Sequence, residues 1–116
     1  MSLGEVIPKL LKFGGTAFQV KSYAADGATL ELDLKENDLI KISVSANVTL
    51  TMVNKNATVI MLIFSNDASA RTITFPAGYW PAEGSTTKTY SLPASSDLLV
   101  TMIYDGTNIY YSALEY

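Results

Sequence analysis

The stretch Ser96–Tyr111 limits the fold of this chain more than any other segment. Two apolar runs, Leu98–Tyr104 and Ile109–Tyr111, flank the sequence Asp-Gly-Thr-Asn at positions 105–108. Glycine adopts positive φ freely, and Asp and Asn tolerate it better than most residues, so this segment suits a tight turn. Apolar runs on both sides of such a turn predict a β-hairpin.

Apolar and polar residues alternate in three segments before this hairpin, which are Leu30–Leu34, Ile40–Val44 and Val48–Met52. Successive side chains of a β-strand point to opposite faces, so each segment predicts a strand with one buried face and one solvated face. Only short turns, such as Glu36–Asn37, separate these strands. Short connections favour antiparallel neighbours, because parallel pairs require longer crossovers.

The segment Ala57–Phe64 interrupts this alternation, because apolar residues occupy both of its faces. Such a strand lies inside a sheet and is covered on each side, either by two layers of its own domain or by a partner subunit. Tyrosine is enriched at interfaces, although alternation sends either Tyr110 or Tyr111 into the core. The candidate subunit interface therefore comprises Ile60, Leu62, Phe64, Tyr111 and Tyr116.

The second half of the chain continues with short strands and turns. We expect a strand at Arg71–Phe75 that Pro76 ends by removing a donor from the ladder, a loop at Ala77–Gly84, and a strand at Lys88–Leu92. Many short strands with frequent turns are typical of sandwiches and jelly rolls. The predicted fold class is all-β: an antiparallel β-sandwich, jelly-roll-like, with about eight strands over residues 28–116.

Residues 1–27 are predicted to form a separate N-terminal arm or edge segment. Within them, Glu5–Phe13 has apolar residues at helical spacing, but Pro8 breaks any helix that begins much earlier. Three interpretations fit this segment: an arm that docks on a neighbouring subunit, an ordinary edge strand, and a frayed terminus.

Composition argues against several classes of function. A net charge of −3 with eight scattered Lys and Arg residues provides no basic patch for nucleic acid. The chain has no Cys and no His, which removes thiolate chemistry, the commonest general base and the commonest transition-metal ligand. No apolar run approaches the roughly 18–20 residues that span a bilayer, and we see no secretion signal. We expect no cofactor, no metal, no membrane partner and synthesis in a cytosol.

The outward positions of the predicted strands carry Ser and Thr where Lys and Glu are usual. Apolar residues make up 48% of the chain and charged residues 16%, which is high apolar content for so small a domain. Flat, uncharged sheet faces and edges make a lone monomer prone to aggregation, and assembly removes this liability by covering them. The chain is therefore predicted to be a homo-oligomer.

Three segments together resemble a known family: NVTLT at Asn47–Thr51, RTITFPAGYW at Arg71–Trp80, and DLLVTMIYDGTNIY at Asp97–Tyr110. In this order they resemble a β-sandwich module that recurs in virion proteins of tailed bacteriophages, in tail fibres, spikes and capsid-attached fibres. The resemblance covers most of the chain. Phe75 and Ile109 stand where the module often has Trp, and both differences keep an apolar side chain.

This resemblance implies a non-enzymatic structural protein of a tailed phage virion, a capsid decoration, head-fibre or tail-fibre subunit that acts by oligomeric assembly. It also implies a trimeric or capsid-bound setting, other virion proteins such as capsid or fibre as partners, and assembly in the cytoplasm of the host bacterium. The matched residues are structural in that family, so the resemblance supplies no active site.

Two neighbouring aromatic residues, Tyr79 and Trp80, indicate an alternative function. Exposed aromatic rings stack on sugar rings, so this pair predicts a carbohydrate-binding module that recognises a host-surface glycan. The competing interpretation is that Trp80 closes one end of the core, which its size favours.

Acidic residues give little support for catalysis or metal binding. Glu31 and Asp33 share one strand face as an acid/base pair would, but the alternating pattern places them on a solvated face without a cleft. Asp105 and Asn108 provide too few oxygens for Ca²⁺, which takes about 6–8 ligands. We therefore expect that the protein is not an enzyme.

Overall fold

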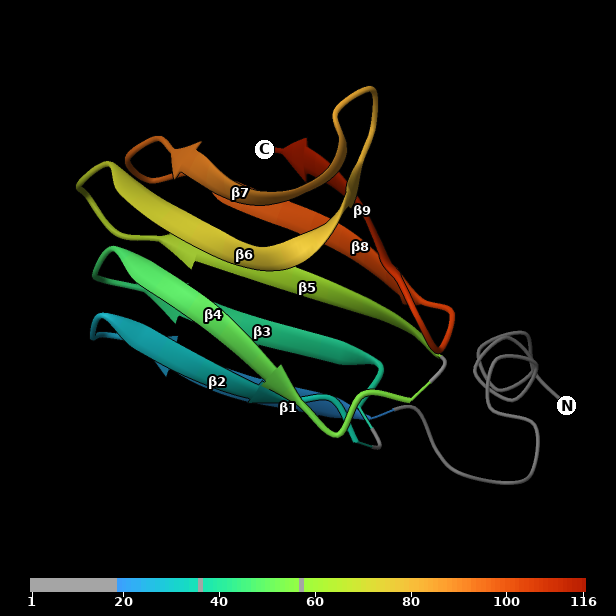
Figure 1. Cartoon of the computed structure of the whole chain (residues 1–116). Helices are drawn as coiled ribbons and strands as arrows, with labels where there is room; N and C mark the ends of the chain where they lie inside the picture. Colours follow the sequence, from blue (N-terminus) through green and yellow to red (C-terminus); the bar gives the residue numbers. More distant parts are fainter. Residues whose placement is uncertain (1–18, 36, 57) are drawn as a thin grey trace, which may run out of the picture.

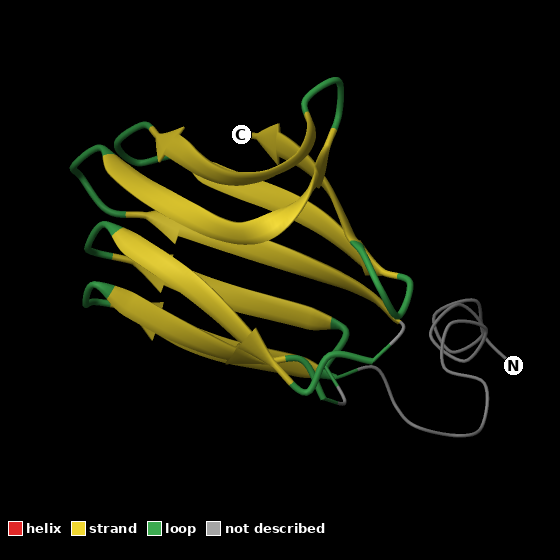
Figure 2. Ribbon diagram, viewed as in Figure 1, coloured by secondary structure: helices red, strands yellow, loops and turns green. Residues whose placement is uncertain are grey.

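The computed structural model describes residues 19–35, 37–56 and 58–116, which form an all-β structure (Figures 1 and 2). Its strands are β1 (Val20–Ala25), β2 (Thr29–Asp33), β3 (Leu39–Val44), β4 (Val48–Val53), β5 (Thr58–Asn66), β6 (Arg71–Trp80), β7 (Gly84–Leu92), β8 (Asp97–Tyr104) and β9 (Ile109–Glu115). The described residues thus form nine strands, where the sequence predicted about eight.

These strands belong to one mixed sheet in the order β1-β3-β5-β8-β9-β6-β4-β2, with β7 paired to β6. Five of the eight pairings are parallel. The sheet curls until its two ends, β1 and β2, lie at the same end of the molecule, so it is nearly closed into a barrel (Figure 1). We call β1, β3, β5, β8 and β9 the β5 wall, and β2, β4, β6 and β7 the β6 wall.

The predicted antiparallel, jelly-roll-like sandwich is wrong. From β1 to β6 the chain alternates between the two walls, so each strand pairs in parallel with the strand two places further along. The short connections, such as residues 45–47, are corners that carry the chain to the opposite wall. Between two parallel partners, the chain forms one strand of the opposite wall. That strand and its two corners supply the long crossover that a parallel pair requires.

Polar side chains at these corners form hydrogen bonds to segments that lie beside them in space but are distant in the sequence. The Asn47 Oδ1 accepts a hydrogen bond from the Thr72 backbone N–H at 3.0 Å. The Asn54 Nδ2 donates to the Asp33 Oδ1, also at 3.0 Å. Asn54 has a φ of 56°, in the left-handed region that Asn tolerates better than most residues. The corner residues therefore adopt the conformation that a turn requires, and they also connect it by hydrogen bonds to neighbouring segments.

The hairpin predicted at Ser96–Tyr111 is confirmed. β8 and β9 pair antiparallel along their length. In the turn, the Asp105 Oδ1 accepts hydrogen bonds from the N–H groups of Asn108 (2.7 Å) and Thr107 (2.9 Å), and Gly106 has a φ of 103°. These hydrogen bonds hold the pKa of Asp105 below its usual value, because they favour the charged carboxylate.

Alternation directs one set of side chains from each wall into a continuous apolar core. Within it lies an aromatic cluster that consists of Phe64 of β5, Phe75 and Trp80 of β6, and Tyr111 of β9. The Phe75 ring makes edge-to-face contacts with the other three rings, at centroid distances of 5.6, 5.2 and 5.5 Å. Each aromatic pair adds about 0.5–1.5 kcal/mol beyond its buried area.

The aromatic cluster lies where the hydrogen-bonded ladder is weakest. β6 and β9 share a single register pair, Tyr79–Tyr110. The Tyr111 hydroxyl donates to the Pro76 carbonyl oxygen at 3.0 Å, which joins β9 to β6 a second time. Gly78 permits this close approach, because a Cβ added there lies 2.5 Å from the Tyr111 ring and 2.9 Å from a backbone oxygen of β9. We call this junction of β6 and β9 the seam.

Pro76 does not end its strand, contrary to the sequence prediction. β6 continues to Trp80, and its pairing with β7 shifts register between Phe75 and Gly78. A bulge of this kind takes Pro76 out of the ladder, so its missing N–H costs no ladder hydrogen bond. The loop predicted at Ala77–Gly84 is therefore mostly strand.

Part of the predicted N-terminal arm, residues 1–18, lies outside the described residues. The rest contains β1, which pairs in parallel with β3 and forms one end of the sheet. The Tyr23 hydroxyl of β1 accepts a hydrogen bond from the Asp33 N–H of β2 at 3.0 Å. This contact spans the gap between the two ends of the sheet.

Replacing Gly78 with alanine tests the close approach at the seam. The added methyl group forces the Tyr111 ring and the β9 backbone to move. Such overpacking lowers the free energy of unfolding by about 1–3 kcal/mol, which urea or thermal unfolding measures. Gly27→Ala is the matched control, because a Cβ added there meets no atom within 4 Å. Equal stability of the two variants would contradict this description of the seam.

Candidate functional site

Alternation along β6 separates Tyr79 and Trp80, the candidate glycan-binding pair. Trp80 points inward, is 5% exposed and stacks on Tyr111 with ring centroids 4.6 Å apart. Tyr79 points outward, is 39% exposed and stacks on Tyr110 at 5.2 Å. Tyr79 and Tyr110 are therefore accessible from solution, while the indole of Trp80 belongs to the core.

Charged side chains border Trp80 without making it a reactive site. The Lys88 Nζ lies 5.4 Å from the centroid of the indole and pairs with the Glu83 Oε2 at 2.8 Å. The Trp80 Nε1 is buried and has no hydrogen-bond partner among the described residues. A buried donor without a partner destabilises the fold, and the ring contacts of Phe75 and Tyr111 oppose that loss. The surroundings of Trp80 are those of a core residue.

The structure places four of the five predicted interface residues in the interior. Ile60, Leu62 and Phe64 are fully buried on the inner side of β5, and Tyr111 is buried in the aromatic cluster. Tyr116, beyond the end of β9, is 71% exposed. Of these five residues, only Tyr116 is available to another chain in this conformation.

A set of outward apolar residues lies on the opposite side of β5 and on its neighbours, and apart from Tyr110 the sequence analysis did not identify them. We call the following outward residues the apolar face: Val59, Met61 and Ile63 of β5, Leu99 and Ile103 of β8, and Tyr110 and Leu114 of β9. Ile63 and Leu99 are half-buried, and the others are exposed. Both sides of β5 are apolar, so hydrophobicity alone did not show which side is exposed. The available signal was Ser65, the exposed polar residue that ends the run on the same side as Val59.

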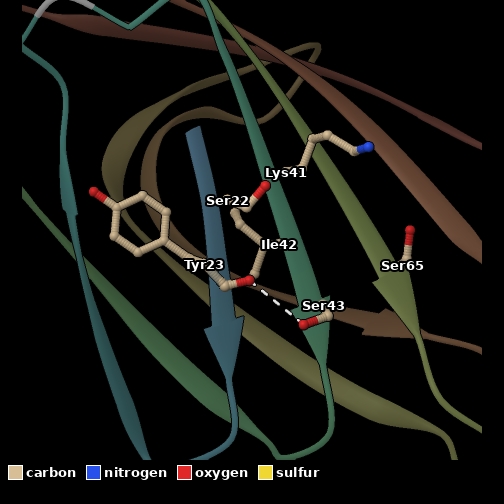
Figure 3. Close-up of a pocket in the computed structure, with 6 residues that line it drawn as sticks. All are labelled: Ser22, Tyr23, Lys41, Ile42, Ser43 and Ser65. Carbon is tan, nitrogen blue, oxygen red and sulfur yellow. Dashed lines mark hydrogen bonds between the residues drawn. The ribbon is translucent and has the colours of Figure 1, made fainter. Parts of the chain in front are cut away.

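A shallow hollow lies beside the apolar face, over β1, β3 and β5 (Figure 3). It encloses about 240 Å³ and is lined by Ser22, Tyr23, Lys41, Ile42, Ser43 and Ser65. Pockets for drug-sized ligands measure about 300–1,000 Å³, so this hollow is small for such a ligand. The Ser43 hydroxyl donates a hydrogen bond to the Tyr23 carbonyl oxygen at 3.4 Å. The exposed lining of the hollow is mostly apolar, and we interpret it as a margin of the apolar face.

Glu31 and Asp33, the candidate acid/base pair, lie on β2 in the β6 wall. The Asp33 Oδ1 accepts hydrogen bonds from Asn54 and from the Lys35 N–H, and these lower the pKa of Asp33. A carboxyl group held in its charged form at a corner is a poor general acid near neutral pH. The described residues contain no group of three or more carboxylates that could hold a metal ion.

The part of the chain that the structure describes contains no helix with the length and hydrophobicity needed to cross a membrane. Comparison with known proteins gives no assignment either, since no family model, curated protein or solved structure matches the chain. The apolar face and the aromatic cluster are therefore interpreted from their own chemistry.

Two substitutions separate the roles of the neighbouring aromatic residues. Trp80→Ala removes a buried ring that contacts Phe75 and Tyr111. Large-to-small changes of this kind cost about 3–5 kcal/mol, so we expect a large loss in urea unfolding. Tyr79→Ala, on the exposed side of the same strand, is expected to cost much less. A stable, folded Trp80→Ala protein would contradict the core assignment.

Proposed function

We propose that this protein is a non-enzymatic structural subunit of a tailed phage virion, of the capsid decoration, head-fibre or tail-fibre type, and that it acts by oligomeric assembly. The observation that carries the proposal is the apolar face. β5 is apolar on both sides, and the described residues cover its inner side alone. Contiguous exposed apolar surface on a small protein marks a site of interaction.

The resemblance to phage modules supports the virion setting. The three matched segments provide β4, β6, β8 and the turn into β9. They include Phe75 and Trp80 of the aromatic cluster and Ile103 and Tyr110 of the apolar face. The resemblance thus falls on strands that form the core and the exposed surface. It favours a trimer, with other virion proteins such as capsid or fibre as partners, assembled in the cytoplasm of the host bacterium.

The charged groups of the described surface support a structural role. Asp67 pairs with Arg71 at 2.9 Å, and this hydrogen-bonded pair lowers the pKa of Asp67. Asp105 accepts hydrogen bonds from its own turn, and Lys88 pairs with Glu83. These carboxylates stabilise local structure, and none of these pairs lines a cleft.

A carbohydrate-binding module is the second candidate, favoured by one observation. Tyr79 and Tyr110 stack on one another and are 39% and 41% exposed, so their outer edges and remaining faces are open to a glycan. Under this alternative, Tyr79→Ala abolishes binding to host-surface glycans and leaves the mass of the protein in solution unchanged. Under the assembly proposal, glycan binding is not required.

Light scattering of the purified protein across a dilution series tests the assembly proposal. We expect a stable mass of about three times the 12.5 kDa of one chain. In the same study, antibody against the protein is expected to label purified phage particles from the source strain. A monomer at all concentrations contradicts oligomeric assembly, and protein that is absent from the particles contradicts the virion setting.

A further inference from the structure

Cross-strand register gathers exposed apolar residues of four strands into one row. Val59 of β5 lies opposite Ile103 of β8. Ile103 lies opposite Tyr110 of β9, which in turn lies opposite Tyr79 of β6. Their exposed fractions range from 39% for Tyr79 to 56% for Val59. Single exposed apolar residues are normal on a protein surface, but four in register form a continuous strip.

This strip continues along the strands into the rest of the apolar face. Met61 lies two residues after Val59 on β5 and is 38% exposed. In the following row Ile63 lies opposite Leu99, and Leu99 lies opposite Leu114 of β9. The row between these two contains Met61, Thr101 and Ser112, so the apolar face spans three neighbouring strands in two apolar rows that Met61 joins on β5.

The outer surface of the β6 wall has a different chemistry. One row across β2, β4, β6 and β7 consists of Thr29, Thr49, Thr74 and Thr89. The hydroxyl oxygens of Thr74 and Thr89 lie 2.9 Å apart. Threonine hydroxyls are readily satisfied by water, so this wall suits a solvated surface. The apolar face has few such groups and loses more by remaining in water.

We infer that the apolar face is the surface through which copies of this chain contact one another. This inference rests on the proposed function, which requires assembly, and it adds the face that mediates the assembly. In a trimer, as the proposed function expects, three such faces meet around a three-fold axis, and each contacts the next copy through interdigitating side chains. The β5 wall provides this face, on which apolar side chains project outward from adjacent strands.

The outer surface of the β5 wall around the apolar face is large enough for a stable contact. β5, β8 and β9 contain 9, 8 and 7 residues. With β3 included, a strand spacing of about 4.8 Å and a rise of about 3.3 Å per residue give roughly 20 Å by 25 Å for the whole outer surface of the four strands. The apolar face occupies part of this surface, and polar residues such as Lys41 and Ser43 of β3 lie beside it. Side-chain relief raises the accessible area above this roughly 500 Å² rectangle, toward the roughly 800 Å² that each partner contributes to a standard interface.

The charge distribution favours a second copy over a different protein. In the rows from Val59 to Ile63, the outward residues described on β5, β8 and β9 carry no charge. Copies of this face can therefore meet around a three-fold axis without bringing like charges together. Lys41, opposite Ile63 on β3, places the nearest cation of that row at the margin of the face. A foreign partner selected by charge would find no complementary group within the apolar face.

Charge substitution on the apolar face tests this inference. Ile103→Glu places a carboxylate at the centre of the row, at a position that is 43% exposed and tolerates it in the monomer. Thr49→Glu is the matched control, because Thr49 is exposed on the β6 wall and faces Thr29 and Thr74. Light scattering gives the mass of each protein, and circular dichroism with thermal melting shows that each remains folded.

We expect a folded monomer for Ile103→Glu, with a dissociation constant at least tenfold higher than wild type, and an unchanged oligomer for Thr49→Glu. If Ile103→Glu does not fold, Val59→Glu repeats the test at a more exposed position of the same row. An Ile103→Glu protein that assembles as wild type does overturns the inference and leaves the proposed function intact. A monomeric wild-type protein overturns both, because the apolar face is then covered in some other way.

Discussion

Packing of Phe75 against three other aromatic rings is the contact on which the nearly closed sheet depends. It joins β5, β6 and β9 at the place where β6 and β9 share one register pair. The backbone ladder alone contributes little there, so side chains supply the attachment. The hydrogen bond from Tyr111 to Pro76 and the bare backbone at Gly78 set the spacing at which the rings meet. The ring packing, the Tyr111–Pro76 hydrogen bond and the close approach at Gly78 all occur at this one junction.

Closure at the seam also decides which residues face outward. With Phe64 and Tyr111 held in the core, alternation along β5 and β9 leaves Val59 and Tyr110 outside. The apolar face is thus a direct consequence of strand register, and it is carried by a hydrogen-bonded sheet. A surface of this kind is already organised for contact, so little conformational entropy is lost when a partner covers it. That property suits a structural subunit.

The sequence predicted strands and turns better than it predicted their pairing. Alternation and turn chemistry are local, which is why the hairpin at Ser96–Tyr111 was recognisable. Parallel pairing was missed because a corner and a hairpin turn use the same short polar segments. Within the candidate site, Pro76 concealed that Tyr79 and Trp80 lie on one strand and therefore point in opposite directions. The exposed side of β5 was missed because both of its sides are apolar.

We propose that other copies of the chain cover the apolar face. The sequence contains no cysteine, so Val59→Cys introduces a single thiol on this face, and Thr49→Cys provides a reference thiol on the β6 wall. The measurement is the rate of maleimide modification at low and high protein concentration. We expect that modification of Val59→Cys slows as the protein is concentrated, while that of Thr49→Cys stays constant. Equal rates for Val59→Cys at both concentrations would contradict this proposal.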